Sequence, residues 1–267
     1  MGEAAERAYL PVKNALEQVG EVMVLTGKTI VSAISPPFPY GTEFVQQFMF
    51  LLRLCWFPLL VSMVALSYGA PGLQAGGFFE LFGSLDRLGG FFILAVIREF
   101  APFVTAIILA GVGGTAITAD LGARKIREEL DALQVLGVDP VKNLVVPRFL
   151  ALMVVTALFS IFALIAGLFG GVLATLTFDA PLGPFFATLL NNATTTELWG
   201  STLKALMFGA IIAMVCCYKG MTVSGGPEGV GRAVNQAVVV SLLGVFSFNY
   251  VFTQTLLATH PEISVLK

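Results

Sequence analysis

The chain has 267 residues, of which 57% are hydrophobic and only 12% are charged, whereas about a quarter of the residues are charged in a typical soluble domain. Such a chain lacks the polar residues that would cover a water-soluble fold, so the composition predicts an all-α integral membrane protein. The net charge of −2 excludes the basic surface by which proteins bind nucleic acid.

The few residues that could bind metal or form disulfides do not form a site. Cys55, Cys216 and Cys217 all lie in apolar runs, which favours buried structural thiols. His260 is the only histidine, so a zinc site of the HExxH type is excluded and we expect no metal.

Residues 9–34 precede the first long apolar run and have the pattern of an amphipathic helix. Its apolar positions recur at helical spacing on one side: Val12, Ala15, Leu16, Val19, Val22, Met23 and Ile30. Lys13, Glu17, Glu21 and Lys28 cluster on the other side. This segregation predicts an interfacial helix that lies in the membrane plane, and a soluble helix packed on a partner is the alternative.

Five apolar segments are each long enough to cross a membrane, which takes about 20 residues. They cover residues 44–68, 88–119, 149–178, 198–218 and 233–259. With a cytoplasmic N-terminus, ten basic residues fall on the cytoplasmic side, and Arg87, Lys204 and Lys267 fall outside. The bias predicts a cytoplasmic N-terminus and an external C-terminus for a single domain of residues 1–267.

Residues 124–139 follow the second span and form the most charged stretch of the chain. Ile126, Leu130 and Leu133 make a short apolar stripe, and Gly137 and Pro140 are placed to end the helix. A short helix that two spans hold at the cytoplasmic surface could transmit force to a soluble partner. A solvated connector is the alternative.

Two blocks of the chain resemble the MlaE/YrbE family of ABC-transporter permeases. The first block contains Arg98-Glu99-Phe100-Ala101-Pro102, Glu128-Glu129-Leu130-Asp131-Ala132-Leu133 and Leu136-Gly137-Val138-Asp139-Pro140. The second contains Cys217-Tyr218-Lys219-Gly220 and Gly225-Gly226-Pro227-Glu228-Gly229. The two blocks keep the order and the separation that the family has, and the resemblance covers most of the chain.

The resemblance implies a permease of the cytoplasmic (inner) membrane that dimerises, binds two cytoplasmic ATPase subunits, and moves lipid between that membrane and MCE-domain proteins outside. It makes residues 124–139 the coupling helix that docks on the ATPase. The residues expected to take part are Arg127, Glu128, Glu129, Asp131, Leu133, Gly137 and Asp139. We expect the ATPase to hold ATP and magnesium, because the glycine-rich loop after residue 224 lacks the lysine and Ser/Thr of a Walker A motif.

Two positions depart from the family pattern. Val112 stands where the family usually has arginine, and Asn249 stands where it often has aspartate. Since two different YrbE subunits pair in actinobacterial Mce systems, we expect a heterodimer in which the other subunit keeps these groups. The expected cargo is fatty acids, mycolic-type lipids or sterols, and a homodimeric permease for phospholipids is the alternative.

Arg98 and Glu99 lie near the external end of the second span, where ionisable groups are costly unless they face a cavity or a partner. Neighbouring helix positions point about 100° apart, so the two side chains cannot face each other. By resemblance the glutamate lines the lipid path, and a structural charge pair is the alternative. Four aromatic residues are further candidates for that path, with ordinary lipid-facing aromatics as the alternative: Phe91, Phe92, Phe100 and Phe103.

Other features of the spans have simpler interpretations. Gly111, Gly113 and Gly114 favour close helix packing, which includes packing between subunits. Arg53 lies inside the first span, and its long stem could reach the cytoplasmic headgroups. An ion-coupled transporter would need repeated halves, which the sequence lacks. An intramembrane enzyme would need a nucleophile, a base or paired acids within the spans, and beyond Glu99 there is no such constellation, so we expect neither.

Overall fold

The computed structural model describes residues 2–261, with side chains at Lys13 and from Leu16 onward. The described residues form helices joined by short turns. Five of these helices are long and apolar enough to cross a membrane: Gly41–Leu81, Leu85–Ile126, Val141–Thr177, Thr195–Met221 and Gly226–Thr259. The predicted all-α integral membrane fold is therefore confirmed.

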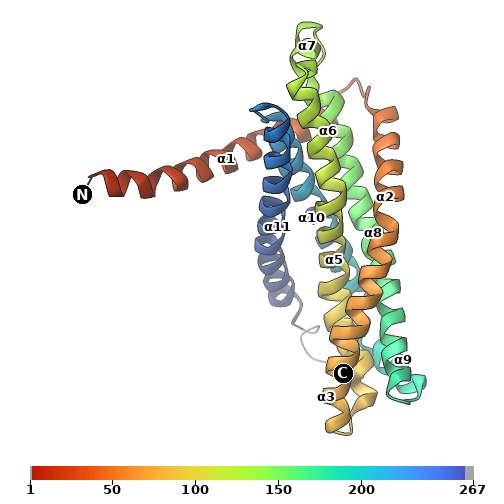
Figure 1. Ribbon diagram of the computed structural model, residues 1–267. Coiled ribbons are helices and arrows are strands. Elements are labelled where there is room, and N and C mark those ends of the chain that lie inside the picture. The colour runs from red at the N-terminus through yellow and green to blue at the C-terminus, as the bar shows by residue number, and fades with distance from the viewer. Residues whose placement is uncertain (1, 262–267) are drawn as a thin grey trace.

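The N-terminal helix α1 (Gly2–Ile34) projects sideways from the bundle (Figure 1). Leu16 and Met23 of the predicted apolar stripe are both 68% exposed. On the polar side, the Tyr218 hydroxyl donates a short hydrogen bond to Glu21, and Lys219 donates to Gln18 Oε1 at 3.0 Å. The bundle thus holds α1 by these polar contacts and by Val22 and Leu25, which pack against its core, while Leu16 and Met23 stay exposed. The side chains of residues 12 and 15 lie outside the described ones.

The first membrane helix is longer than the predicted residues 44–68. It consists of α2 (Gly41–Ser67), the π-helical turn η1 (Tyr68–Gln74) and α3 (Ala75–Leu81). Pro71 lies inside η1. A wider π turn absorbs the hydrogen bond that proline cannot make, so the chain stays helical beyond the predicted end.

The second membrane helix also exceeds the predicted residues 88–119. It runs through η2 (Leu85–Arg87), α4 (Leu88–Phe92), η3 (Ile93–Phe100), α5 (Ala101–Ile108), η4 (Leu109–Gly114) and α6 (Thr115–Ile126). The extra length at the end is polar, because α6 continues through Arg124 and Lys125 past the apolar part of the helix. A prediction from hydropathy alone ends where the apolar residues end.

The other three membrane helices have the predicted order, each with one or two extra turns. They are η5 with α8 (Val141–Val145 and Val146–Thr177), α10 (Thr195–Met221) and α11 (Gly226–Thr259). A short helix that was not predicted, α9 (Leu182–Asn192), packs against α4 at the end of the bundle opposite α7. Its Phe185 is buried against Phe92, with ring centroids 5.5 Å apart.

The core of the bundle is built on α8 and α10. Helix α8 packs between α2 and α10, and α10 also contacts α6 and α11. Small residues allow this close packing: a Cβ added at Gly113 would lie 2.7 Å from Leu51, and one at Gly114 would lie 2.8 Å from the Cys216 sulfur. Gly111 has open space beside it, so of the three glycines only this one is free to contact another subunit. The three cysteines are free and buried, as predicted.

Candidate functional site

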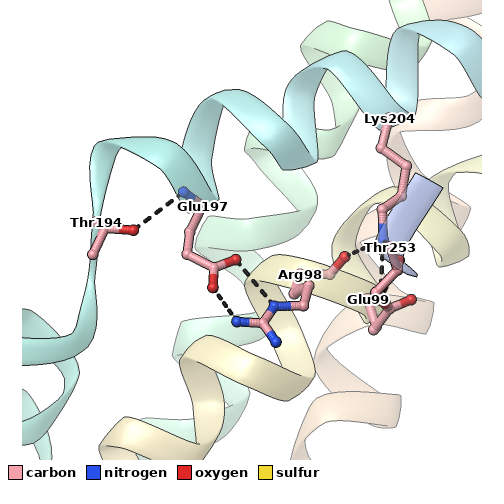
Figure 2. Close-up of polar contacts among 6 residues, drawn as sticks. All are labelled: Arg98, Glu99, Thr194, Glu197, Lys204 and Thr253. Atoms are coloured by element: carbon pink, nitrogen blue, oxygen red, sulfur yellow. Dashed lines mark hydrogen bonds and ion pairs between the residues drawn. The ribbon is translucent and has the colours of Figure 1, made fainter. Parts of the chain in front are cut away.

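Four ionisable side chains meet inside the bundle, from two different membrane helices (Figure 2). Arg98 and Glu99 come from η3, and Glu197 and Lys204 come from α10. Lys204 and Glu197 are 0% and 2% exposed, and Arg98 is 9% exposed. We call these four residues the charged layer.

The first ion pair of the charged layer joins Arg98 to Glu197. The arginine Nε donates to Glu197 Oε2 at 3.2 Å, and its Nη2 makes a second, shorter bond to Oε1. This two-pronged geometry is the strongest form of the arginine–carboxylate interaction. It satisfies both buried charges at once, so the pair can be accommodated away from water.

The second ion pair joins Lys204 to Glu99. Lys204 Nζ lies 3.1 Å from Glu99 Oε1, and Thr253 of α11 donates to the same oxygen at 3.0 Å. Asn249 Nδ2 donates to the other carboxylate oxygen at 2.9 Å. Three donors therefore surround Glu99. At position 249 an amide can donate to the Glu99 carboxylate, whereas an aspartate would place a second carboxyl group beside it.

Lys204 also bonds a backbone carbonyl that a proline leaves without its usual donor. Pro102 has no N–H to give to the carbonyl of Arg98, four residues earlier. Lys204 Nζ donates to that carbonyl oxygen at 2.7 Å. An unsatisfied carbonyl inside a membrane costs several kcal/mol. The buried ammonium therefore satisfies a backbone group as well as pairing with Glu99.

The charged layer is electrically balanced, with two cations and two anions, but its members are not equally accessible. The side chain of Glu99 is 31% exposed, and that of Lys204 is 1% exposed. As predicted, Arg98 and Glu99 turn to different partners. Glu99 is the member that reaches an open face of the bundle, beside α11, so it is the one that a ligand could contact.

The sequence placed Lys204 near the start of the fourth span, residues 198–218, and counted it among the external basic residues. It lies within the membrane helix α10 and is fully buried. The structure adds two partners that the sequence did not pair with Arg98 and Glu99: Glu197 binds Arg98, and Lys204 binds Glu99. Glu197 was missed. Its signal is the run Thr194-Thr195-Thr196-Glu197, typical of a helix start, in which Thr194 Oγ1 accepts from the Glu197 N–H at 3.3 Å.

The four aromatic candidates for the path have different surroundings. Phe92 is fully buried and packs on Phe185 and against Gly171, so it is a core residue and lines no open surface of the chain. The other three are partly buried. Phe103 packs on Phe246 of α11, with ring centroids 4.7 Å apart, on the helix that also carries Asn249 and Thr253. Phe91 packs on Phe79, and Phe100 directly follows Glu99.

A second polar cluster lies where α2, α6 and α8 meet. Arg148 is 1% exposed, and its Nη2 lies 2.6 Å from Asp120 Oδ2 and 3.5 Å from Glu43 Oε1. Glu99 and Asp120 lie on the same membrane helix, about 30 Å apart along its axis at 1.5 Å per residue. That separation matches the thickness of the hydrocarbon core. The two clusters therefore mark two levels of the bundle one membrane thickness apart.

The segment predicted as one helix over residues 124–139 is divided in the structure. Residues through Ile126 belong to α6, and Glu128 adopts a left-handed conformation with φ of 59° that ends the run. The separate helix α7 (Glu129–Val135) then forms the tip of the bundle, beyond the other helices (Figure 1). Lys125 Nζ bonds both carboxylate oxygens of Asp131 at 3.0 Å, which fixes α7 against α6.

Gly137 ends α7, as its position in the sequence predicted. Its φ is 76°, and its N–H donates to the Gln134 carbonyl at 3.0 Å. The Val138 N–H donates to the Leu133 carbonyl at 2.9 Å. These two bonds are those of a Schellman cap, which needs a left-handed residue at this point. The tip is therefore a short helix with a defined end.

The surface of the tip combines charge with exposed apolar side chains. Val135 and Leu136 are 88% and 76% exposed. Arg127, Glu128, Asp131 and Asp139 are exposed too, and Leu130 is buried beneath them. Arg127 donates to Glu129 Oε1 at 2.7 Å, and this bond raises the pKa of the guanidinium. Large exposed apolar residues beside charged ones, at the end of a bundle, are typical of a docking surface.

Comparison with known proteins decides the family. Residues 44–255 match the family described as "Permease MlaE", which is well over half of the chain. The chain belongs to the MlaE permease family. Among the described residues, no group of three or more His, Cys, Asp or Glu side chains could hold a metal ion.

Two of the relatives of this MlaE permease are described as probable ABC transporter permeases, and a third has a different name. A probable ABC transporter permease of Synechocystis is 36% identical over 181 residues, 67% of this chain and 68% of the relative. One from Rickettsia prowazekii is 28% identical over 251 residues, 92% of this chain and 96% of the relative. The chloroplastic Arabidopsis protein TRIGALACTOSYLDIACYLGLYCEROL 1 is 32% identical over 179 residues, 66% of this chain and 50% of that protein.

Membership settles the general role of the chain. It is the multi-pass membrane subunit of an ABC transporter and is not an enzyme. The family implies that a separate ATPase subunit supplies the energy.

Proposed function

We propose that this MlaE permease is the membrane subunit of an ATP-driven lipid transporter of the Mce type. In this proposal it pairs with a second, YrbE-type permease subunit of different sequence, and the two bind two cytoplasmic ATPase subunits that hold ATP and magnesium. MCE-domain proteins on the external side exchange fatty acids, mycolic-type lipids or sterols with the permease. The observation that carries the proposal is the combination of an exposed apolar tip at one end of the bundle with a charged layer at the other.

The tip is the site where the ATPase would act. Val135 and Leu136 offer apolar anchors, and Glu129 and Asp131 are held in place by Arg127 and Lys125. Helix α6 is the end of the second membrane helix next to α7, and the same membrane helix carries Glu99, about 30 Å from Asp120 along its axis. A force applied to α7 would therefore be transmitted along one continuous helix to the charged layer.

The charged layer is the site where the polar end of a lipid would bind. Glu99 is partly exposed beside α11, and Lys204, Asn249 and Thr253 hold its carboxylate. The rest of the bundle offers acyl chains an apolar environment. The name of the Arabidopsis relative contains that of a galactolipid, which supports a lipid as the cargo of this chain as well.

The orientation and the partner subunit belong to the same proposal. The basic residues predict that the tip and the N-terminus lie in the cytoplasm and that the charged layer lies toward the external side of the cytoplasmic membrane. Gly111, with open space beside it, is a place for a second subunit to pack closely. The heterodimer rests on Val112 and Asn249, where this chain departs from the family pattern.

Native mass spectrometry of the complex, purified through a tag on this chain, tests the composition and the cargo together. We expect a second permease sequence, two ATPase subunits, and a bound fatty acid, mycolic-type lipid or sterol. A complex with one permease sequence would refute the heterodimer, and bound phospholipid alone would favour phospholipid transport. A chain that carries no ATPase subunit would contradict the proposal as a whole.

A further inference from the structure

Arg53 is an arginine on the outer surface of the bundle that the transport mechanism does not use. It lies on α2, its side chain is exposed, and among the described residues no hydrogen bond or ion pair reaches it. It follows Glu43, a member of the Arg148 cluster, by ten residues of the same helix, which is about 15 Å along the axis. It therefore lies midway between the two polar clusters, near the centre of a hydrocarbon core about 30 Å thick.

A cation at that depth needs an anion. Placing an arginine at the centre of a membrane helix costs about 3 kcal/mol in insertion experiments, and such residues pair or extend toward the headgroups. The guanidinium can reach back toward the cytoplasmic side only by the length of its stem. When the side chain extends toward the nearer leaflet, an anionic headgroup there would pair with it and offset part of that cost, less the cost of desolvating the anion.

The surface around Arg53 is hollowed on both sides. A cavity of about 420 Å³ between α2 and α8 is lined by Arg53, Trp56, Leu60, Phe159 and Phe162, among others, and this volume is within the range of small-ligand sites. A second hollow, on the side of the Arg148 cluster, is lined by Arg53 and Gln46 and by the apolar residues Val45, Met49, Phe50 and Leu54. Arg53 thus lies as an exposed cation between two mainly apolar hollows.

A second copy of this chain could not supply the missing anion. Among the described residues, the acids in the interior of the spans are Glu99 and Glu197, and both are paired with cations of their own chain. Glu43 and Asp120 are engaged by Arg148. A phospholipid with a net negative headgroup fits this surface, because its phosphate can pair with the exposed Arg53 and its acyl chain can lie in the apolar groove beside it. Trp56, three residues after Arg53, offers an indole N–H on the same side of the helix.

We propose that the groove between α2 and α8 binds an anionic phospholipid from the nearer leaflet, with its phosphate on Arg53 and one acyl chain along Trp56 and Phe162. The site lies on the outer face of α2 and α8 and differs from the charged layer. It does not depend on which lipid the transporter moves.

Tryptophan fluorescence tests this site directly, because the chain has only two tryptophans, Trp56 and Trp199. In the W199F variant, Trp56 is the sole reporter, and bromine atoms on a bound acyl chain quench it. The full chain is reconstituted in phosphatidylcholine vesicles that contain a fixed fraction of dibrominated phosphatidylglycerol or, in parallel, of dibrominated phosphatidylcholine. We expect the anionic lipid to bind about tenfold more strongly, the factor that corresponds to one charge-assisted hydrogen bond.

Two further variants test whether Arg53 is the residue responsible for the preference for phosphatidylglycerol. Arg53→Gln should abolish the preference for phosphatidylglycerol, and Lys28→Gln, which removes an exposed cation from α1, should leave it unchanged. Equal quenching by the two lipids, or a preference that survives in R53Q, would overturn the proposal. Absence of quenching by either lipid would mean that protein covers the groove, which would overturn it as well.

Discussion

The two ends of the bundle use charged residues in opposite ways. In the charged layer, Arg98, Glu197 and Lys204 are buried, and each finds its partner within the chain. At the tip, the pairs Arg127–Glu129 and Lys125–Asp131 are partly or largely exposed, and α7 with its cap also carries two exposed apolar side chains, Val135 and Leu136. The buried pairs are needed for the stability of the bundle, because losing either partner leaves the other charge buried without a counter-charge. Exposed pairs contribute little to stability and leave the tip free to bind another protein.

The largest expected effect is a difference in stability loss between a variant in the charged layer and a variant at the tip. Glu197→Gln leaves Arg98 charged and buried without its carboxylate, and breaking a buried pair in this way costs about 3–5 kcal/mol. We expect a strongly lowered unfolding temperature in detergent. Glu129→Gln at the tip is the matched control and should cost less than about 1 kcal/mol. Equal losses for the two variants would remove the contrast between the ends.

The next largest effect is expected on lipid transport, from a variant of the charged layer that still folds. Glu99→Gln keeps the size of the side chain but removes its charge and one acceptor oxygen. Lys204 keeps its bonds to the Arg98 carbonyl and to Thr253, and Glu99 is partly exposed, so we expect a smaller loss of stability than in Glu197→Gln and a complex that still folds. The charge that attracts Lys204 and faces the open side is lost, and we expect ATP-driven lipid movement to fall at least about tenfold, the equivalent of 1.4 kcal/mol. Unfolding temperature and transport rate are measured on the same preparation. Wild-type transport by a well-folded E99Q complex would show that Glu99 has only a structural role.

At the tip the expected effect is on coupling and not on folding. Leu136→Asp changes an exposed residue, so stability should stay within about 0.5 kcal/mol, but the charge disrupts an apolar contact with the ATPase. We expect the complex to lose the ATPase subunit on size-exclusion chromatography. Leu81→Asp is the matched control, since Leu81 is 84% exposed at the opposite end of the bundle. Retention of the ATPase by L136D would place the docking surface elsewhere.

The smallest expected effect concerns the shape of the tip. Gly137→Ala places a side chain at a φ of 76°, which costs about 1–2 kcal/mol. Because this strain is local, we expect faster hydrogen exchange in α7 and unchanged exchange in α8 and α10. Gly111→Ala, in a helix with open space, serves as the control and should not change exchange at the tip. Unchanged exchange in α7 of G137A would mean that the cap does not define the tip.

Hydropathy was sufficient to predict the number, order and class of the membrane helices, because each contains a long apolar run. It failed at their ends and at α9. The polar turns of α6 and the π turn at Pro71 continue a helix without continuing its apolar pattern. At the tip, Gly137 and Pro140 predicted where the helix stops, but the left-handed Glu128 that separates α7 from α6 gave no signal of its own.

The charged layer was the feature least accessible to prediction. Arg98 and Glu99 were found because two adjacent charges in an apolar run are unusual. Their partners Glu197 and Lys204 lie about 100 residues later, and only the packing of α10 on η3 and α5 brings them together. Lys204 was expected near the start of the fourth span, but the sequence does not reveal that it bonds Glu99 and the Arg98 carbonyl.

The most direct test of the account is lipid movement in proteoliposomes that contain the purified complex and a fluorescent lipid. We predict transfer that needs ATP and the ATPase subunit, and that Leu136→Asp abolishes. Transfer by this chain alone, or ATP-driven transfer that persists undiminished in L136D, would contradict the claim that the tip couples a separate ATPase to the charged layer.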